Sequence, residues 1–457
     1  MANISALYTA LSGMQAQRKV MDVTAHNVSN ASTEGYHRQR VELVSSGTKM
    51  GAGIFAGRST AYGVDVQGVT RSVDTLLEAR SVREEAGRSA ATATNSTMER
   101  IEGIFAEPTD TGIASQLQAF WGSWTDVANN PGGLASRTAL LQSADTLAAT
   151  LHRAAGDLQS VKDTAIAGMV DLSTDANDLA KQIATINKQI VGAPESANDL
   201  RDQRELLVNQ LAQLTGAQAR NGDNGQVDVY IGGRAIVAGQ LSFAVDGTGG
   251  TLKWASDGQA VNAPSGKAAS LTATITDIVP RYAASLDGMV NKLVTQVNAV
   301  HNAGYDQSGA TGRNFFDPAN VTAASISLSV DVAGLPQNVA AGAPVLPGPT
   351  APGALDGEQA RAISLIADST TGPDSDYRSL VSSLAVESRA ATRRADIQDQ
   401  IADATRAEAD SVGAVSIDEE MANLTASQRA FEASARVLTT VDSMLDTLIH
   451  STGLVGR

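Results

Sequence analysis

Histidines are the residues of this chain with the widest chemical range, because imidazole binds metals and transfers protons near neutral pH. The five are His26, His37, His152, His301 and His450. They are scattered, and no second histidine or carboxylate accompanies any of them at the spacing of a known metal motif. We therefore expect each to be solvated or to make a local hydrogen bond.

Other chemistry is also poorly represented. The chain has no cysteine, which excludes disulfides, thiolate zinc sites and cysteine nucleophiles. Gly266-Lys267 lacks the earlier glycine of a phosphate-binding loop, and Asp306-Gln307-Ser308-Gly309 lacks the spaced carboxylates of a calcium loop. The sequence predicts no catalytic residue, no metal and no cofactor, and hence a protein that is not an enzyme.

The composition excludes some classes of binding partner and indicates how the chain packs. The 457 residues include 34 basic and 49 acidic side chains, a net charge of −15, which disfavours binding to nucleic acid or anionic lipid. No apolar run approaches the ~18 residues of a membrane span. The first twenty residues do not fit a cleaved secretory signal, because Arg18 and Lys19 follow the apolar positions. Aromatic residues make up only 4%, so we expect thin, helix-rich packing in about three domains.

The two ends of the chain carry the apolar spacing of coiled-coil helices. Steps of three and four residues, interrupted once by Arg18, connect the apolar positions near the N-terminus: Ile4, Leu7, Leu11, Met14, Met21, Ala25 and Val28. The same rhythm runs through the C-terminal segment: Ile417, Met421, Leu424, Gln428, Phe431, Ala435, Leu438, Asp442, Leu445 and Ile449. Ser416 and Glu419 resemble a capping box that starts this helix. One such helix alone would be an ordinary surface helix, but two matched helices at opposite ends favour pairing.

The interior is predicted to be mainly α with inserted β: terminal coiled-coil helices, a long-helix middle domain and a small β-rich outer module. Helical spacing over 140–190 predicts a rod of roughly 75 Å, and alternation at Val227, Val229 and Ile231 predicts strands. Four segments are expected: a terminal helical assembly domain of 1–34 with 413–457, a helix-rich middle domain of 35–220 with 263–318 and 355–412, a small β-rich module at 221–262, and a Pro-rich extended or β segment at 319–354.

One motif carries a resemblance. The segment 27–36, with Asn27, Asn30, Gly35 and Tyr36, is similar to the N-terminal signature of bacterial flagellar axial proteins, the rod, hook and hook-associated families. Gln428-Arg429-Ala430-Phe431 matches the closing helix of the same group. Tyr62 to Val66, 302–306 with Phe315-Phe316, and 417–424 resemble the hook-associated protein 1 family within it. The order of parts, long helices directly after the first β stretch, favours that family over hook proteins.

The resemblance implies a structural subunit outside the cell, at the junction of hook and filament. Such subunits are exported unfolded, without a cleaved signal, through the flagellar type III apparatus and assemble in a ring or helical layer. The implied partners are further copies of the chain, the hook protein, the second hook-filament junction protein, the export apparatus and an export chaperone. The assembly interface would use the large apolar residues of both ends: Ile4, Leu7, Leu11, Met14, Met21, Val28, Ile417, Met421, Leu424, Phe431, Leu438 and Leu445.

Two alternatives remain open. A hook or distal-rod subunit would share the terminal motifs but is expected to have an all-β centre. An axial protein with an enzymatic or adhesive insertion would need a pocket with convergent polar groups within 221–355. For the junction subunit, the terminal helices have no partners in the free chain, so they are expected to be partly disordered and to fold on assembly.

Overall fold

The computed structural model describes residues 2–46, 63–105, 107–193, 197–344, 353 and 355–451. Long helices dominate and three small antiparallel sheets are inserted among them, so the predicted fold class, mainly α with inserted β, is confirmed. The chain forms two compact units. Unit 1 contains Met1–Ala86, Ala176–Ala244 and Gln400–Arg457, and unit 2 contains Gly87–Asp175 and Val245–Asp399.

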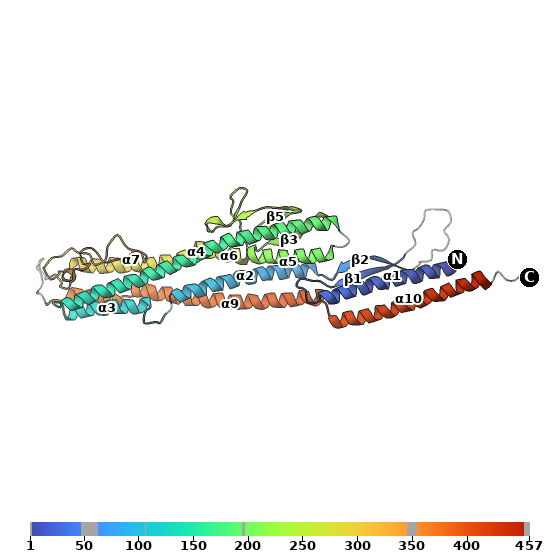
Figure 1. Ribbon diagram of the computed structural model, residues 1–457. Helices are drawn as coiled ribbons and strands as arrows, with labels where there is room; N and C mark the ends of the chain where they lie inside the picture. The colour runs from blue at the N-terminus through green and yellow to red at the C-terminus, as the bar shows by residue number, and fades with distance from the viewer. Residues whose placement is uncertain are drawn as a thin grey trace, which may run out of the picture. The chain divides into compact units, whose positions relative to one another are not determined.

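Unit 1 brings the two ends of the chain together. Helix α1 and helix α10 lie side by side, with the two termini at the same end of the pair (Figure 1). The unit also holds a β-hairpin and a helix followed by a four-stranded sheet. Its complete elements are α1 (Ala2–Asn30), β1 (Gln39–Ser45), β2 (Val64–Arg71), α5 (Asn198–Thr215), β3 (Gln218–Asn221), β4 (Val227–Ile231), β5 (Arg234–Ala238), β6 (Leu241–Ser242) and α10 (Ile417–Ser451).

The sheets of unit 1 follow from short-range sequence signals. β1 pairs antiparallel with β2, and the register shifts between Glu42 and Leu43. The second sheet has the order β3-β4-β5-β6. The three predicted strand residues of β4, Val227, Val229 and Ile231, are all buried while their neighbours are not, which confirms the alternation. Gly232 and Gly233 both adopt positive φ, so this two-residue turn depends on glycine.

Unit 2 is built from helices around an aromatic centre. Its complete helices are α3 (Ile113–Asn129), α6 (Gly266–Ala273), α7 (Val279–Ala303) and α8 (Glu358–Ser364), and its strands are β7 (Val245–Asp246) and β8 (Lys253–Trp254). The rings of Phe120 and Trp124 contact Phe315, with centroids 5.9 and 5.0 Å away. The chain has few aromatic residues, but unit 2 gathers several of them in one core.

Three helices contribute residues to both units: α2 (Thr75–Ile104), α4 (Leu134–Gly192) and α9 (Pro373–Gly413). Helix α4 contains 59 residues without interruption, which confirms the predicted rod. The N-terminus of α2 is capped by the carboxylate of Asp74, which accepts the backbone N–H of Leu76 at 2.9 Å and that of Leu77 at 3.2 Å.

Some expectations about segments need comment. The strands predicted within 221–262 are present, but they belong to two separate sheets, and β3 begins earlier, at Gln218. Between 319 and 344 the chain forms turns, one 3₁₀ turn at Pro336–Asn338, and two isolated antiparallel bridges, Leu328 with Phe316 and Gly342 with Tyr305; 345–352 and 354 lie outside the described residues. Our division of the chain into four domains stays a prediction.

Candidate functional site

Asn27, in the last turn of α1, joins three parts of unit 1. Its side-chain amide donates to the backbone carbonyl of Gln39 at 2.9 Å and to the carboxylate of Glu420 at 3.0 Å. Its carbonyl oxygen accepts the backbone N–H of Gln39 at 3.0 Å and the hydroxyl of Tyr36 at 2.8 Å. The side chain is almost fully buried and makes all four hydrogen bonds open to an amide. Asn27 therefore ties α1 to β1 and to α10.

Glu420 is the matching group on α10. Its carboxylate is buried and accepts hydrogen bonds from Asn27 and from the guanidinium of Arg38, whose Nε lies 2.7 Å from Oε1. Arg38 also donates to the exposed carboxylate of Glu419 at 2.9 Å. We call Asn27, Arg38 and Glu420 the base lock. A buried carboxylate with an arginine and an amide as partners is strongly oriented.

The capping box predicted for α10 is only half correct. The hydroxyl of Ser416 accepts the backbone N–H of Glu419 at 3.5 Å, as an N-cap does. The carboxylate of Glu419 instead pairs with Arg38. The ion pair with the N-terminal segment has replaced the local contact, because Arg38 lies close enough to offer a charged donor.

The other signature residues shape the turn between α1 and β1. The side chain of Asn30 donates to the carbonyl of His26 at 3.0 Å, and Gly35 adopts φ +74°, which favours glycine. The hydroxyl of Tyr36 contacts both Asn27 and His26. Burial, with the nearby carboxylate of Asp199, raises the pKa of Tyr36, so the phenol stays protonated and donates. Each signature residue at the start of the chain thus has a structural task.

His37 lies inside an ion-pair cluster. Its Nδ1 is 2.8 Å from Asp202 and its Nε2 is 3.4 Å from Glu78, and its backbone N–H also donates to Asp202 at 3.2 Å. Burial opposes a charge on the ring, but the hydrogen bonds to Asp202 and Glu78 prevail and raise the pKa of His37 to about 10. The expectation that His37 is solvated or bonded only locally is wrong, because its partners lie far away in the sequence.

Arg71 completes this cluster and decides its chemistry. His37, Asp202 and Glu205 are close enough to hold a metal ion. However, Arg71 donates to Asp202 at 2.6 Å and to both oxygens of Glu205 at 2.7 and 2.8 Å. The carboxylates already bind a guanidinium, and a protonated imidazole has no lone pair for a metal. The cluster is therefore best described as an ion-pair network that joins β1, β2 and α5.

The contact between α1 and α10 is made mainly by small and polar side chains. The buried residues are Ala10, Ala16, Val23, Thr24 and Asn27 on α1, and Glu420, Ser427 and Val441 on α10. A Cβ placed on Gly13 would lie 3.3 Å from the hydroxyl of Ser434, so the two helices approach closely there. Such close approach requires small residues, because large side chains hold helix axes apart.

The large apolar residues predicted as the assembly interface lie beside this contact. Leu7, Met14, Met21, Val28, Leu424, Phe431, Leu438 and Leu445 are half-buried, whereas Leu11, Ile417 and Met421 are exposed. The side chain of Ile4 lies outside the described residues, and so does Tyr62 of the second motif. Gln428 and Arg429 are exposed on α10. Their part in assembly stays a prediction.

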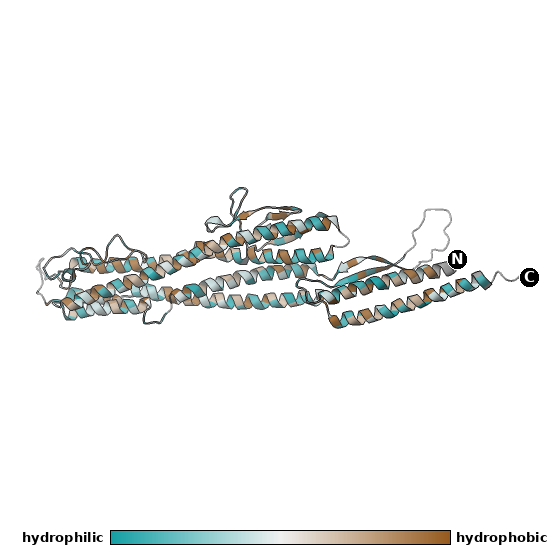
Figure 2. Ribbon diagram, viewed as in Figure 1, coloured by the Kyte–Doolittle hydropathy of each residue, from teal (hydrophilic) through white to brown (hydrophobic). Residues whose placement is uncertain are grey.

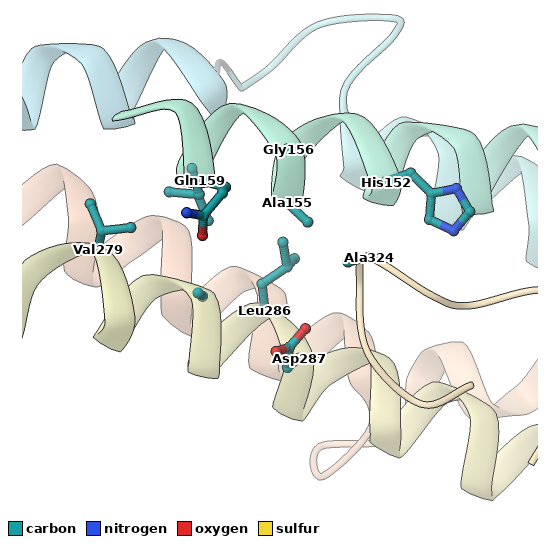
Figure 3. A pocket seen from close by; sticks show the side chains of 10 residues that line it. His152, Ala155, Gly156, Gln159, Val279, Leu286, Asp287 and Ala324 are labelled. Atoms are coloured by element: carbon teal, nitrogen blue, oxygen red, sulfur yellow. The ribbon is translucent and has the colours of Figure 1, made fainter. Parts of the chain in front are cut away.

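Unit 2 contains a groove between two of its long helices. It lies between α4 and α7 and is lined by His152, Ala155, Gln159, Leu286 and Asp287 among others (Figure 3). The imidazole of His152 is engaged with the carbonyl of Ile326 at 2.9 Å, and Asp287 accepts the backbone N–H of Ala323 at 2.8 Å. Both polar groups hold backbone in place.

Among the described residues no helix is long and apolar enough to cross a membrane.

Comparisons with known proteins agree with this arrangement. Three family models match: "Flagella basal body rod protein" over residues 7–37, "Flagellar hook-associated protein FlgK helical domain" over 98–316, and "Flagellar basal body rod FlgEFG protein C-terminal" over 413–450. Flagellar hook-associated protein 1 of Bacillus subtilis is 28% identical, with 99% of each chain aligned. The chain is similar to the hook-associated protein 1 family over its whole length.

Two further similar proteins, both hook-associated protein 1, are longer than this chain. The Escherichia coli protein is 28% identical over 68% of this chain and 60% of its own length, and the Salmonella typhimurium protein is 28% identical over 70% and 61%. A solved structure, the flagellar hook junction protein FlgK from Burkholderia pseudomallei, superposes with a TM-score of 0.64 at 15% identity. It covers 72% of this chain and 99% of its own, and shows a shared fold.

The family models that match the two ends of the chain cover most of the site. The two rod-type models cover most of α1, the signature turn and nearly all of α10; they contain Asn27 and Glu420 of the base lock, and Arg38 directly follows the first of them. By this similarity the chain is a structural protein of the bacterial flagellum, which lies outside the cell and assembles with hook components.

Sequence reasoning found the signature but missed most of its partners. His37 and Arg38 directly follow the recognised segment, which was the available signal. Glu420 directly precedes Met421, which belongs to the predicted apolar register, but Glu420 itself does not belong to it. Asp202 and Glu205 on α5 gave no signal, because acidic residues at helical spacing are common on solvated helix faces.

Proposed function

We propose that this chain forms the junction layer between hook and filament through its paired terminal helices. The base lock carries the proposal. It joins segments 393 residues apart, Asn27 and Glu420, by a buried hydrogen bond, and so makes one unit of the two chain ends. A subunit whose two ends form one rigid base can repeat in a helical array through contacts that do not close on themselves.

The finer features of this function are also proposals. The partners are further copies of the chain, the hook protein on one side and the second hook-filament junction protein on the other. Before assembly the chain would be carried by an export chaperone to the type III apparatus. The role is purely structural and requires no catalysis. The long helices of unit 2 support a junction subunit over a hook subunit, for which an all-β centre is expected.

The assembly surface would include the half-buried residues Phe431 and Leu438 of α10. We predict that Phe431→Asp with Leu438→Asp leaves unit 2 folded and abolishes polymerisation, since two charges would have to be buried between helices. The measurement is electron microscopy of purified protein added to isolated hooks, with circular dichroism as the test of folding. The matched control replaces the exposed Gln428 and Arg429 with alanine. Normal layers from the aspartate variant would refute the assignment.

A further inference from the structure

A groove of about 560 Å³ runs along the base of the terminal helix pair within unit 1. Val20 and Val23 of α1, Val41 of β1 and the two alanines Ala422 and Ala426 of α10 give it an apolar lining. Its polar rim contains Arg38, Arg40, Glu419 and Asn423. The base lock holds the three elements together, and the groove is therefore a built feature of the subunit.

Two large apolar side chains of α10 are exposed close to the part of this helix that lines the groove. Ile417 is 52% exposed and Met421 is 48% exposed, one helical turn apart. In Figure 2 the ribbon of α10 has the brown colour of hydrophobic residues at its first turn. We call Ile417 and Met421 the knob. A pair of exposed large apolar residues at one spot on a helix indicates a contact surface.

The knob and the groove lie on different flanks of one helix. At about 100° per residue, Ala426 is turned roughly 140° from Met421 and 180° from Ile417 about the axis of α10. The mean positions of the knob and of the two alanines differ by only about 7 Å along that axis. A convex apolar surface on one side and a concave one on the other suit neighbours arranged side by side.

Charge complements this shape. Asp418 is next to the knob and exposed, and Arg40 is on the rim of the groove and exposed. Neither makes an ion pair with another described residue. If the knob of one copy enters the groove of the next, these opposite charges come to the same contact.

We infer that Ile417 and Met421 of one copy occupy the groove formed by α1, β1 and α10 of a neighbouring copy. The inference rests on the proposed function and names the partner surface within the layer. Because the two surfaces differ, each copy offers a free knob and a free groove, and the contact propagates as a ring or a helix. The occupant is a second copy of this chain, since its own exposed knob supplies the apolar shape and the adjacent Asp418 supplies a carboxylate for Arg40, whereas the groove's own Glu419 and Glu420 are paired with Arg38.

The cysteine-free chain allows a direct test by disulfide cross-linking. Met421→Cys and Val41→Cys are made in separate full-length chains, one of them tagged, and the two are mixed during assembly on isolated hooks. We expect a mixed disulfide dimer on mild oxidation, because a disulfide needs Cβ atoms about 4 Å apart. Met421→Cys mixed with Gln218→Cys, an exposed position on β3, is the control and should not cross-link.

A charge reversal provides the second test. Asp418→Arg in the Met421→Cys chain, or Arg40→Asp in the Val41→Cys chain, should each lower the yield of mixed dimer about two- to fivefold, the range for an exposed ion pair. The two changes together, one in each chain, should restore the yield. Circular dichroism checks that each variant folds. No recovery in the double variant would overturn the charge pairing that supports the contact.

The outcomes separate the inference from the proposed function. If layers form on hooks without the mixed dimer, the inference fails and the function stands. Disulfides only between two Met421→Cys chains would show a symmetric contact, and cross-links from Val41→Cys to a different flagellar subunit would give the groove another occupant; either overturns the inference. If the unmodified chain forms no layer on hooks, the proposed function itself fails.

Discussion

The two units are stabilised in different ways. Unit 2 has a core of large rings and aliphatic side chains, with Trp124, Phe120, Phe315 and Phe316 fully buried. In unit 1 the terminal helices are joined by small residues and by polar contacts such as Asn27 to Glu420. The helix pair of unit 1 also leaves large apolar side chains such as Leu11, Ile417 and Met421 exposed. Large buried rings thus stabilise unit 2, and close approach and buried polar contacts join the ends of the chain in unit 1.

The largest expected effect is the loss of an aromatic residue from unit 2. Trp124→Ala removes a fully buried ring that contacts Phe120, Phe315 and His301. We expect a loss of about 3–5 kcal/mol in the free energy of unfolding, from lost burial and the cavity left behind. Chemical denaturation followed by near-ultraviolet circular dichroism measures it. Val330→Ala, at an exposed position of the same unit, is the control. A loss below 1 kcal/mol would contradict the view that rings stabilise unit 2.

Loss of the base lock should destabilise unit 1 about as much as loss of a ring destabilises unit 2, but the effect should be confined to the start of α10. Arg38→Ala leaves the carboxylate of Glu420 buried without its charged partner, which costs about 3 kcal/mol. We expect faster amide exchange at the start of α10, measured by hydrogen-deuterium exchange, and unchanged exchange in unit 2. Arg436→Ala, an exposed position on the same helix, is the control. Equal exchange in both variants would mean that the lock does not hold α10.

Two histidines give the units opposite responses to pH. His37 has its pKa raised to about 10, so its contribution to stability is complete below pH 6.5 and is lost as pH rises towards 10. Burial lowers the pKa of His301 to about 4, so its contribution is complete above pH 6.5 and is lost as pH falls towards 4. Each change is at most about 1.4 kcal/mol per pH unit.

The hydrogen bonds of His301 explain its neutral state. Its Nδ1 donates to the carbonyl of Arg313 at 2.8 Å, and its Nε2 accepts the backbone N–H of Ala340 at 2.8 Å. Both nitrogens would be donors in the protonated ring, so protonation breaks the second bond. Exchange in each unit should be followed from pH 5 to 9, with His37→Gln and His301→Gln as comparisons. A variant that keeps the normal pH response of its unit would show that its histidine is not the cause.

Periodicity predicted the helices of this fold, but could not predict which side chains connect them. The rod of α4 and the two terminal helices follow from local spacing. The predicted interface consisted of the largest apolar residues, such as Leu11 and Met421, yet the helices of one subunit meet at Ala10, Gly13 and Ser434. Close packing selects small residues, and spacing alone does not distinguish an inner from an outer stripe.

The ion pairs were beyond prediction for a second reason. His37 and Asp202 are 165 residues apart, and each on its own reads as an ordinary surface residue. Their meeting depends on how α5 packs against the β1–β2 hairpin, which is a tertiary result. The signature turn was recognised as a motif, but its chemical reason was not: three of the four hydrogen bonds of Asn27 are made to Tyr36 and Gln39, and the fourth requires Glu420 of α10.

The smallest expected effect comes from an ion pair outside the base lock. Arg80 and Glu408 of unit 1 lie 3.7 Å apart and are both more than half exposed. Water screens such a pair, so Arg80→Gln should change the free energy of unfolding by less than about 0.5 kcal/mol. The measurement is the denaturation midpoint at low and at high salt, beside Arg38→Ala under the same conditions. If Arg80→Gln cost as much as Arg38→Ala, net charge rather than burial would stabilise unit 1, and the contrast between its buried lock and its surface pairs would fail.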